Sequence, residues 1–362
     1  MTEFSHQAAE RLPAAEREAI LANPGFGNAF TDHMVSIAWT REQGWHDPQV
    51  LPYGPIQMDP AASVLHYGQE IFEGIKAYRH PNGDIVTFRP EANARRLNES
   101  ARRLALPELP EELFVQALEE LVRVDADWVP SGEDQTLYIR PFMIADESFL
   151  GVRAAEKARF MVIASPAGPY FSGGVKPVSI WLSEHMARAG EGGTGAAKCG
   201  GNYAASLLPT RVAQQHGCAQ VLFTDARTED QIDELGGMNL FLVRADGTLV
   251  TPALNGNILD GVTRRSIIEL ARDRGHSVEE RAVTVSEWRD GVADGSIVEA
   301  FACGTAAVIT PIASLQGEQG TILDFGDGAP GELTMSLREQ LTGIQFGTVD
   351  DTHGWVHRIV SA

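Results

Sequence analysis

The segment at residues 165–177, SPAGPYFSGGVKP, divides the chain into two halves of different pattern. Before it, the sequence indicates mostly strands with two helices, and after it strands and helices alternate. Its Pro, Gly and Ser content favours an interdomain connector, and a long surface loop inside one domain is the alternative. Because 362 residues exceed what one hydrophobic core usually organises, we expect an N-terminal α/β domain at residues 1–164 and a C-terminal domain at 178–362.

Local patterns support a mixed architecture. Asn82-Gly83 lies between alternating apolar residues and predicts a two-residue β-hairpin turn, in which both positions need a positive φ. The class predicted is α+β, or mixed α/β, in two domains. Periodicity predicts helices over 90–104, 111–127, 202–216, 262–274, 286–294 and 332–342, and strands over 137–145, 159–165, 178–182, 220–224, 238–243 and 297–302.

Charge and cysteine content exclude several classes of function. The formal net charge of −20 argues against nucleic-acid binding, which needs a basic face. Three cysteines without CxxC spacing, Cys199, Cys218 and Cys303, predict neither a disulfide framework nor a zinc site, and fit a reducing cytoplasm. We expect no signal peptide in the acidic N-terminal stretch, and no apolar run approaches the ~18 residues of a membrane span.

One lysine lies in a setting suited to imine chemistry. Lys198 stands in GGTGAAKCGGNYAASL, just before a predicted helix. A phosphate loop would need Gly before the lysine and Ser or Thr after it, whereas Ala197 and Cys199 occupy those places. The alternative is an ordinary solvated surface lysine without a catalytic role. Burial among small apolar residues would favour the neutral amine that attacks a carbonyl, and the freed amine could then act as a general base.

A carboxylate downstream has an unusual apolar setting. Glu234 follows Ile232 and precedes Gly236-Gly237 and an apolar strand. Burying it is unfavourable unless a cation meets it, and a protonated ring nitrogen of a cofactor would be such a cation. An exposed acid in a turn is the alternative.

Two places suit a phosphate group. Gly261, Val262 and Thr263 begin a predicted helix, where unpaired N–H groups and the helix dipole favour an anion. Gly304-Thr305-Ala306 follows an apolar strand and offers further backbone donors with a hydroxyl. Each alone is also explained by ordinary capping or turn formation. An arginine would complete such a site, and Arg96 is one candidate.

A second arginine interrupts an apolar strand. Arg140 lies in LYIRPFMI, where a charge usually ends in a salt bridge. Arginine is also the residue that clamps carboxylate substrates through paired hydrogen bonds. Both interpretations stay open at this point.

Taken together, these segments are similar to the branched-chain amino-acid aminotransferases, a family of fold-type IV enzymes that depend on pyridoxal 5'-phosphate (PLP). The motifs follow the order of the family from near residue 26 almost to the end of the chain. They are FTDHM (30–34), LHYGQEIFEGIKAYR (65–79), FRPEANARRL (88–97), LYIRP (137–141), SPAGPYF (165–171), GGTGAAKCGGNYA (192–204), DELGGMNLF (233–241), DGVTRRS (260–266) and GTAAVITP (304–311).

The resemblance implies a role for each matching residue. Lys198 matches the Schiff-base lysine, Tyr203 the tyrosine on the phenolic oxygen of PLP, and Glu234 the acid on the ring nitrogen. The implied phosphate contacts are Arg96, Val262, Thr263 and Thr305. The implied substrate contacts are Phe26, Tyr67 and Tyr138 in the side-chain pocket, Arg140 at the distal carboxylate of glutamate, and Ala306 and Ala307 at the α-carboxylate.

The implied activity is reversible amino transfer from L-leucine, L-isoleucine or L-valine to 2-oxoglutarate. The resemblance also implies a homodimer, with an active site near the domain junction and a loop supplied by the partner subunit. Two relatives of the same fold, a D-amino-acid aminotransferase and an aminodeoxychorismate lyase, are alternatives that share the lysine and the ring contacts. A non-catalytic binding protein that kept the fold is the alternative from another class.

Overall fold

The computed structural model describes residues 2–169, 174–228, 230–326 and 328–362, which form two units. Unit 1 comprises residues 1–169, 197–200 and 343–362, and unit 2 comprises residues 170–196 and 201–342. Four residues of the predicted connector, 170–173, and so the end of the SPAGPYF motif, lie outside the described residues. The domain limits expected from the sequence stay a prediction, and the last strand of the first half continues to Ala167.

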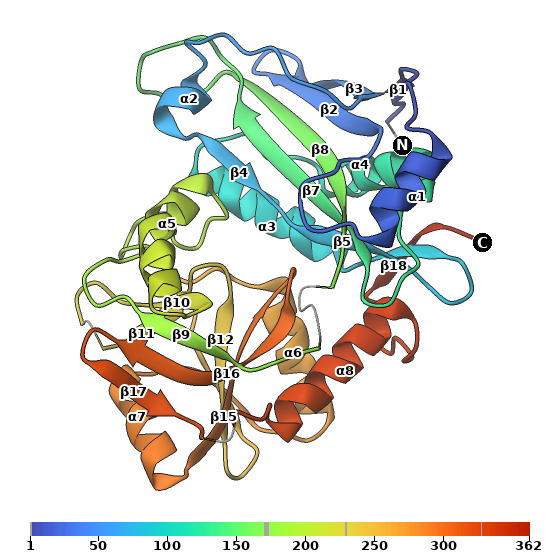
Figure 1. Ribbon diagram of the computed structural model, residues 1–362. Helices are drawn as coiled ribbons and strands as arrows, with labels where there is room; N and C mark the ends of the chain where they lie inside the picture. Colours follow the sequence, from blue (N-terminus) through green and yellow to red (C-terminus); the bar gives the residue numbers. More distant parts are fainter. Residues whose placement is uncertain (1, 170–173, 229, 327) are drawn as a thin grey trace. The chain divides into compact units, whose positions relative to one another are not determined.

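Within its described residues, unit 1 contains a nine-stranded sheet with the order β1-β3-β2-β8-β7-β5-β6-β18, and β4 pairs with β7 (Figure 1). All pairs are antiparallel except β1 with β3. The strands are β1 (Ser5–His6), β2 (His33–Thr40), β3 (Gly44–Pro52), β4 (Glu70–Phe72), β5 (Ile75–Arg79), β6 (Ile85–Phe88), β7 (Thr136–Ala145), β8 (Lys157–Ala167) and β18 (Val356–Val360).

The hairpin predicted at Asn82-Gly83 is present, but its turn is longer than expected. β5 pairs with β6, and the N–H of His80 donates to the carbonyl of Asp84 at 2.9 Å, which closes a loop over residues 81–83. Only Gly83 has a positive φ, of 91°. Pro81 presets the φ of the first loop position, so a three-residue loop that ends in a left-handed glycine replaces the two-residue turn.

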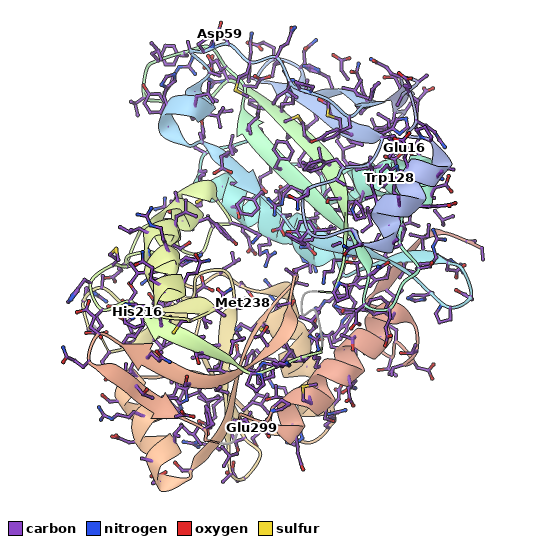
Figure 2. All side chains as sticks on the ribbon, viewed as in Figure 1. Glu16, Asp59, Trp128, His216, Met238 and Glu299 are labelled. Atoms are coloured by element: carbon purple, nitrogen blue, oxygen red, sulfur yellow. The ribbon has the colours of Figure 1, made fainter. Side chains whose placement is uncertain are left out.

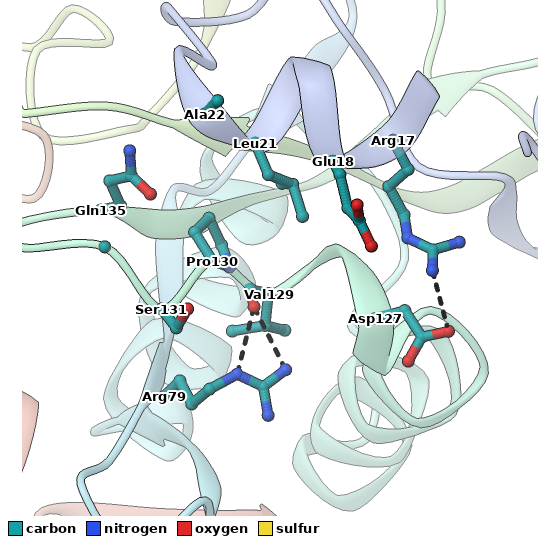
Figure 3. Close-up of a pocket in the computed structure, with 11 residues that line it drawn as sticks. Arg17, Glu18, Leu21, Ala22, Arg79, Asp127, Val129, Pro130, Ser131 and Gln135 are labelled. Atoms are coloured by element: carbon teal, nitrogen blue, oxygen red, sulfur yellow. Dashed lines mark hydrogen bonds and ion pairs between the residues drawn. The ribbon is translucent and has the colours of Figure 1, made fainter. Parts of the chain in front are cut away.

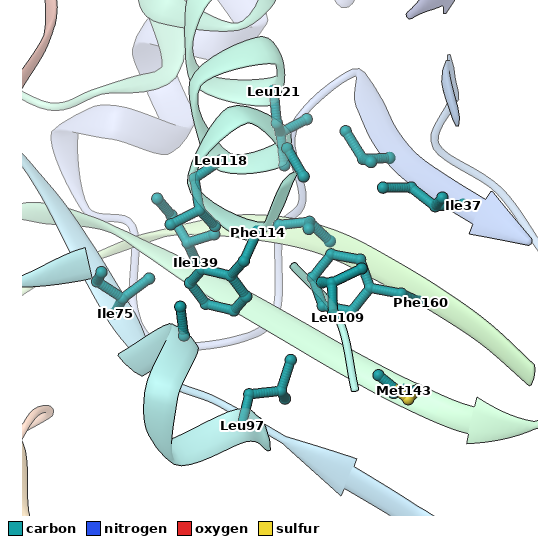
Figure 4. Close-up of a cluster of buried hydrophobic side chains, with 14 of the residues drawn as sticks. Ile37, Ile75, Leu97, Leu109, Phe114, Leu118, Leu121, Ile139, Met143 and Phe160 are labelled. Atoms are coloured by element: carbon teal, nitrogen blue, oxygen red, sulfur yellow. The ribbon is translucent and has the colours of Figure 1, made fainter. Parts of the chain in front are cut away.

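The helices of unit 1 build one side of its core. They are α1 (Ala14–Ala22), α2 (Ser63–Tyr67), α3 (Pro90–Arg103) and α4 (Glu111–Val124), followed by a 3₁₀ turn at Ala126–Trp128. Pro90 stands at the first helical position of α3, where its missing N–H costs nothing. Apolar side chains of α3 and α4 pack with side chains of the sheet in one buried cluster, which includes Leu97, Phe114, Leu118, Ile139 and Phe160 (Figure 4).

Within its described residues, unit 2 contains a second nine-stranded sheet with the order β11-β10-β9-β16-β15-β12-β13-β14, and β17 pairs with β16. Three pairs are parallel (β9 with β10, β9 with β16, β13 with β14), and the other pairs are antiparallel. The strands are β9 (Val178–Leu182), β10 (Gln220–Thr224), β11 (Ile232–Leu235), β12 (Asn239–Arg244), β13 (Leu249–Pro252), β14 (Val278–Arg281), β15 (Ile297–Gly304), β16 (Val308–Gly317) and β17 (Gly320–Asp324).

Four helices accompany this sheet along the chain. They are α5 (Gly200–Gln215), α6 (Val262–Asp273), α7 (Val285–Asp294) and α8 (Glu332–Phe346), and α8 continues into residues grouped with unit 1. Each unit has its own apolar core, and Figure 2 labels one buried side chain of each, Trp128 in unit 1 and Met238 in unit 2.

The mixed α/β class and the long periodic elements predicted from sequence are therefore confirmed, with ends that differ by a few residues. None of the described helices combines the length and the apolar character that a membrane crossing requires.

Candidate active site

The predicted imine lysine packs with unit 1. Its neighbours Ala197 and Cys199 belong to the apolar core of that unit and are 2% and 3% exposed. The N–H of Lys198 donates to Ser100 Oγ at 2.9 Å, and its carbonyl accepts from the N–H of Phe72 at 3.0 Å. Nζ lies 4.8 Å from the centroid of the Phe72 ring. The surroundings are those of a half-buried amine beside an aromatic face rather than of a solvated surface lysine.

A buried ion pair lies beside this lysine in unit 1. Both carboxylate oxygens of Glu73 accept from Arg96, from Nε at 2.8 Å and from Nη2 at 2.7 Å, and Asn93 donates to the same carboxylate at 2.8 Å. Glu73 is 0% exposed and Arg96 is 4% exposed. Burial by itself raises the pKa of Glu73, but the charge and hydrogen bonds of Arg96 and the charge of Lys198 outweigh burial, so that this pKa lies below its ordinary value.

Sequence reasoning assigned Arg96 to a phosphate and did not select Glu73. The structure shows how this arginine is held in place: the Glu73 carboxylate engages one edge of the guanidinium in a bidentate contact. The signal available in the sequence was an acid in FEGIKAYR, a stretch that otherwise has the pattern of a buried strand.

The other arginine, Arg140, lies among aromatic rings. Side chains alternate along β7, so that Tyr138, Arg140 and Phe142 share the face opposite the one that enters the core. The Arg140 guanidinium carbon lies 4.7 Å from the Phe72 ring centroid and 5.4 Å from that of Tyr138, and Nη2 donates to the Tyr138 hydroxyl at 2.9 Å. Its Nε is buried without a hydrogen-bond partner among the described residues.

Of the two other predicted pocket residues, Phe26 contacts this aromatic group and Tyr67 bonds elsewhere in unit 1. The ring of Phe26 meets that of Tyr138 edge to face, with centroids 5.1 Å apart. Tyr138 also packs so closely on Gly74 that a Cβ there would lie 2.2 Å from its hydroxyl, so any larger residue at 74 would displace the Tyr138 side chain. The Tyr67 hydroxyl, at the end of α2, donates to the carbonyl of Leu150.

In unit 2, the predicted ring-nitrogen acid is buried in strand β11 and is already paired. Glu234 is 3% exposed, which excludes the exposed turn acid. Its Oε1 accepts from Arg188 Nη1 at 2.9 Å and from the N–H of Leu259 at 3.1 Å. Arg188 in turn donates to the carbonyl of Asn257 at 2.9 Å. The buried carboxylate therefore keeps a cationic partner from the chain itself, which sequence reasoning did not identify.

Asn239 connects Glu234 with the predicted phosphate region. Its Nδ2 donates to Glu234 Oε2 at 3.0 Å and to the carbonyl of Leu259 at 2.9 Å. A Cβ on Gly261 would lie 2.1 Å from Asn239 Oδ1, so the N-terminus of α6 lies directly against this amide. Across the sheet, Asn239 is the register partner of Cys303, the residue before Gly304. Asn239 thus contacts the acid and the helix start with its side chain, and its backbone pairs with the strand that ends in the turn.

The residues expected at the phosphate and at the α-carboxylate belong to these two neighbouring places. Val262 and Thr263 form the first turn of α6, whose cap residue, Gly261, contributes no side-chain acceptor to the helix N–H groups. Thr305, Ala306 and Ala307 form the loop between β15 and β16, in which Gly304 is the register partner of Val308.

Tyr203, on α5, lies near the hairpin that follows Glu234. A Cβ on Gly237 would be 3.9 Å from its ring, and a Cβ on Gly304 would be 3.4 Å from the carbonyl of Gly237. Gly237 therefore stands between the phenol of Tyr203 and the β15–β16 turn. In unit 2, the structure brings together the phenol, the acid, the helix start and the turn that the sequence selected separately.

The predicted residues thus form two groups, one in each unit. Unit 1 holds Lys198, Arg96, Arg140, Tyr138, Phe26 and Tyr67, and unit 2 holds Tyr203, Glu234, Val262, Thr263, Thr305, Ala306 and Ala307. A surface hollow of about 570 Å³ in unit 1, beside α1 and residues 127–135, is lined by none of them (Figure 3).

The donor set fits a flat, phosphorylated cofactor with a carbonyl carbon. A buried acid suits a protonated ring nitrogen, a phenol suits a phenolic oxygen, and a helix start with a hydroxyl-bearing turn suits a phosphate. A lysine beside an aromatic face supplies the amine for the carbonyl. The residues present therefore meet the chemical requirements of PLP.

Comparison with known proteins agrees with this chemistry. A family model described as "Amino-transferase class IV" matches residues 70–315. The branched-chain-amino-acid aminotransferase of Mycolicibacterium smegmatis is 58% identical over 95% of both chains. The solved Escherichia coli branched-chain amino acid aminotransferase superposes with a TM-score of 0.74 at 26% identity, covering 90% of this chain and 100% of that one.

A third comparison, with the branched-chain amino acid aminotransferase of Thermobaculum terrenum solved in its PLP form, gives a TM-score of 0.73 at 27% identity, and covers 90% of this chain and 98% of that one. The fold and the two groups of residues define a fold-type IV PLP-dependent transaminase. The chain belongs to the class IV aminotransferases and, within them, to the branched-chain amino-acid aminotransferases.

We predict that Glu73→Gln lowers the free energy of unfolding by about 3–5 kcal/mol near neutral pH, because it leaves the buried Arg96 without its carboxylate. The pKa of Glu73 is lowered in the folded chain, so the stability it contributes is present above its unfolded pKa and is lost as pH falls through the lower folded value. Urea unfolding should therefore show the difference from wild type shrinking at acid pH.

Glu111→Gln is the matched control, since Arg95 and Glu111 form an exposed pair at 3.6 Å. The control should change stability by about 1 kcal/mol or less. If both substitutions lowered the free energy of unfolding equally, the predicted stabilisation by the buried Glu73–Arg96 pair would be wrong.

Proposed function

We propose that the protein catalyses the reversible transfer of the amino group of L-leucine, L-isoleucine or L-valine to 2-oxoglutarate, giving the 2-oxo acid and L-glutamate. The observation that carries this proposal is Arg140, a guanidinium held in unit 1 by the rings of Phe72 and Tyr138 and by the Tyr138 hydroxyl. Such a wall offers apolar surface to a branched side chain and a hydrogen-bonding cation to a carboxylate.

Relatives support both substrate classes. Solved branched-chain aminotransferases of similar fold are described as complexed with N-(5'-phosphopyridoxyl)-L-glutamate and with 4-methylvaleric acid. The first is an adduct of an amino acid that carries a distal carboxylate, and the second is a branched aliphatic acid. We propose the same two classes of ligand for this chain.

PLP, when bound, supplies a carbonyl that accepts the amino group and a ring that takes up the electrons released at the substrate Cα. Lys198 Nζ would hold the carbonyl carbon of PLP in the resting enzyme. The same amine, when free, would act as the general base that moves the proton from the substrate Cα. The backbone contacts of Lys198 to Ser100 and Phe72 hold the residue in place meanwhile.

The other residues hold charge at the ends of the cofactor and substrate. Glu234, which pairs with Arg188, would favour a protonated ring nitrogen, and Tyr203 would donate to the phenolic oxygen. Arg96, Val262, Thr263 and Thr305 would hold the phosphate, and the N–H groups of Ala306 and Ala307 would hold the substrate α-carboxylate.

Arg140 decides how one pocket accepts two kinds of side chain. Glutamate places its distal carboxylate in the side-chain pocket. A purely apolar pocket, without a cation or hydrogen-bond donor for this carboxylate, would reject it. Leucine requires the apolar surface of Phe26, Tyr67 and Tyr138 and no charge. A guanidinium stacked on rings serves both cases, since its flat faces stay covered while its edge can donate.

We also propose that the protein is a cytoplasmic homodimer. Apolar side chains of α2 and residues 149–152 are exposed: Leu65 at 60%, Phe149 at 37%, Leu150 at 61% and Val152 at 85%. The two segments are joined by hydrogen bonds from Phe149 to Ala61 and from Ser63 to Glu147. Exposed apolar residues clustered in one region of the surface are typical of a protein–protein interface. Because the chain resembles a homodimeric family, we propose that a second copy of the chain binds there.

An amino-donor panel with 2-oxoglutarate tests the function. L-leucine, L-isoleucine and L-valine should be used far better than D-alanine, and Lys198→Ala should reduce turnover to background. D-alanine as the preferred donor would favour the D-amino-acid aminotransferase alternative. Substantial transamination by Lys198→Ala would refute the role of the lysine.

We predict that Arg140→Ala lowers kcat/KM for L-glutamate about ten- to hundredfold, the value of a hydrogen bond to a charged group, and changes kcat/KM for L-leucine much less. Arg159→Ala, on the neighbouring strand β8, is the control because Arg159 pairs with Asp146. Similar losses for both donors would count against the distal-carboxylate role.

For the assembly, we predict that Val152→Asp shifts the protein towards monomer in sedimentation velocity, because it buries a charge at the interface. Val298→Asp, at an exposed valine of β15, should leave the distribution unchanged. A monomeric wild-type protein, or a dimer unaffected by Val152→Asp, would contradict this interface.

A further inference from the structure

The turn between β15 and β16 contains a strained residue. Val308 has a φ of +62°, the left-handed region. Among the described non-glycine residues with positive φ (Asp47, Arg89, Ala105, Asp134 and Val308), it is the β-branched one. A β-branched side chain is strongly disfavoured there, because its branches crowd the backbone. Something in the surrounding structure must therefore hold Val308 in this conformation.

Arg338, on α8, contacts the backbone on both sides of Val308. Its Nη1 donates to the carbonyl of Ala307 at 2.8 Å and to the carbonyl of Ile309 at 3.0 Å. The peptide that joins Ala307 and Val308 is planar, so holding its carbonyl also sets the direction of the N–H on Val308. Rotation of that peptide by half a turn would bring Val308 to an ordinary extended φ and relieve the strain, but it would carry the Ala307 carbonyl away from Arg338.

Arg338 is not required to attach the start of α8 to the sheet. Glu299 of β15, labelled in Figure 2, accepts from the N–H groups of Leu333 at 3.1 Å and Thr334 at 2.9 Å. It also accepts from the Thr334 hydroxyl at 2.6 Å. A second arginine, Arg274, donates to Ser336 Oγ on α8 at 2.8 Å. The contact of Arg338 with two carbonyls of the turn therefore acts on the conformation of the turn itself rather than on the docking of α8.

We propose that Arg338 is a positioning residue, which holds the Ala307–Val308 peptide in its strained orientation and so keeps the 305–307 loop in the form that binds anions. The inference rests on the proposed function, in which Thr305 contacts the cofactor phosphate and Ala306 and Ala307 contact the substrate α-carboxylate. A flipped peptide would redirect the Ala307 carbonyl oxygen, a partial negative charge, within the loop that must receive those anions.

The test uses the strain itself. Glycine adopts a left-handed φ without penalty, so Val308→Gly should remove the strain of the present turn and make its geometry much less dependent on Arg338. The variants are Arg338→Met, Val308→Gly and the double variant. Arg274→Met is the matched control, since it removes another arginine contact to α8 and leaves the turn untouched. Arg338→Lys keeps a donor for the carbonyls and should fall between wild type and Arg338→Met.

Three quantities are measured: the Kd of PLP for the apoprotein, the Kd of 4-methylvaleric acid for the holoenzyme from the change in cofactor absorbance, and the split of kcat and KM for L-leucine. Arg338→Met should raise both Kd values and KM about tenfold, equivalent to about 1.4 kcal/mol, with a smaller change in kcat. The double variant should return close to Val308→Gly alone, and Arg274→Met should match wild type.

If Arg338→Met weakens binding of PLP and 4-methylvaleric acid, and adding Val308→Gly does not restore that binding, the proposal is overturned. Arg338 would then serve to dock α8. Wild-type affinity in Arg338→Met would overturn it as well. If Arg338→Met does not fold, the same comparison is made with Arg338→Lys. Failure of the proposed function is distinguishable, since it would appear as a wild-type enzyme that does not use branched-chain donors, whereas PLP binding by the apoprotein still reports on the turn.

Discussion

The bidentate contact between Glu73 and Arg96 organises the polar part of unit 1. Arg96 and Ser100 lie one turn apart on α3, on the same side of the helix. Arg96 is held by Glu73, which follows β4 directly, while Ser100 accepts the N–H of Lys198. The carbonyl of Lys198 in turn accepts from Phe72, the neighbour of Glu73. The lysine segment, α3 and the end of β4 are therefore held by one short chain of hydrogen bonds, with the buried ion pair at its centre.

Unit 2 uses an amide for a comparable purpose. Asn239 donates to Glu234 and lies against the start of α6. It is also the first residue of β12, which pairs with β15. An amide can do this without adding charge, whereas a second carboxylate or cation would disturb the pairing of Glu234 with Arg188. The acid and the two predicted anion-binding places thus share one neutral connector.

Sequence reasoning predicted the residues that carry distinctive chemistry and missed those that hold them. Lys198 and Glu234 were selected because a lysine among glycines and an acid in an apolar strand need an explanation. Glu73 carried a similar signal that was not used, whereas Arg188 and Asn239 carried none, because only the folded chain shows which carboxylate they contact. The 80–84 turn shows the same limit locally, because Asn82-Gly83 predicted the hairpin but not the three-residue loop that the bond between His80 and Asp84 closes.

The partners of the buried acid Glu234 determine how much the site must rearrange when its cofactor binds. Glu234 has Arg188, Asn239 and the N–H of Leu259 as partners, so the chain itself supplies this carboxylate with a cation and hydrogen-bond donors. A site whose charges are already oriented needs little reorganisation when a ligand binds. The strained Val308 fits the same principle, because strain held by hydrogen bonds from Arg338 is built up during folding rather than during binding. Folding therefore sets the orientation of the groups that the proposed chemistry needs.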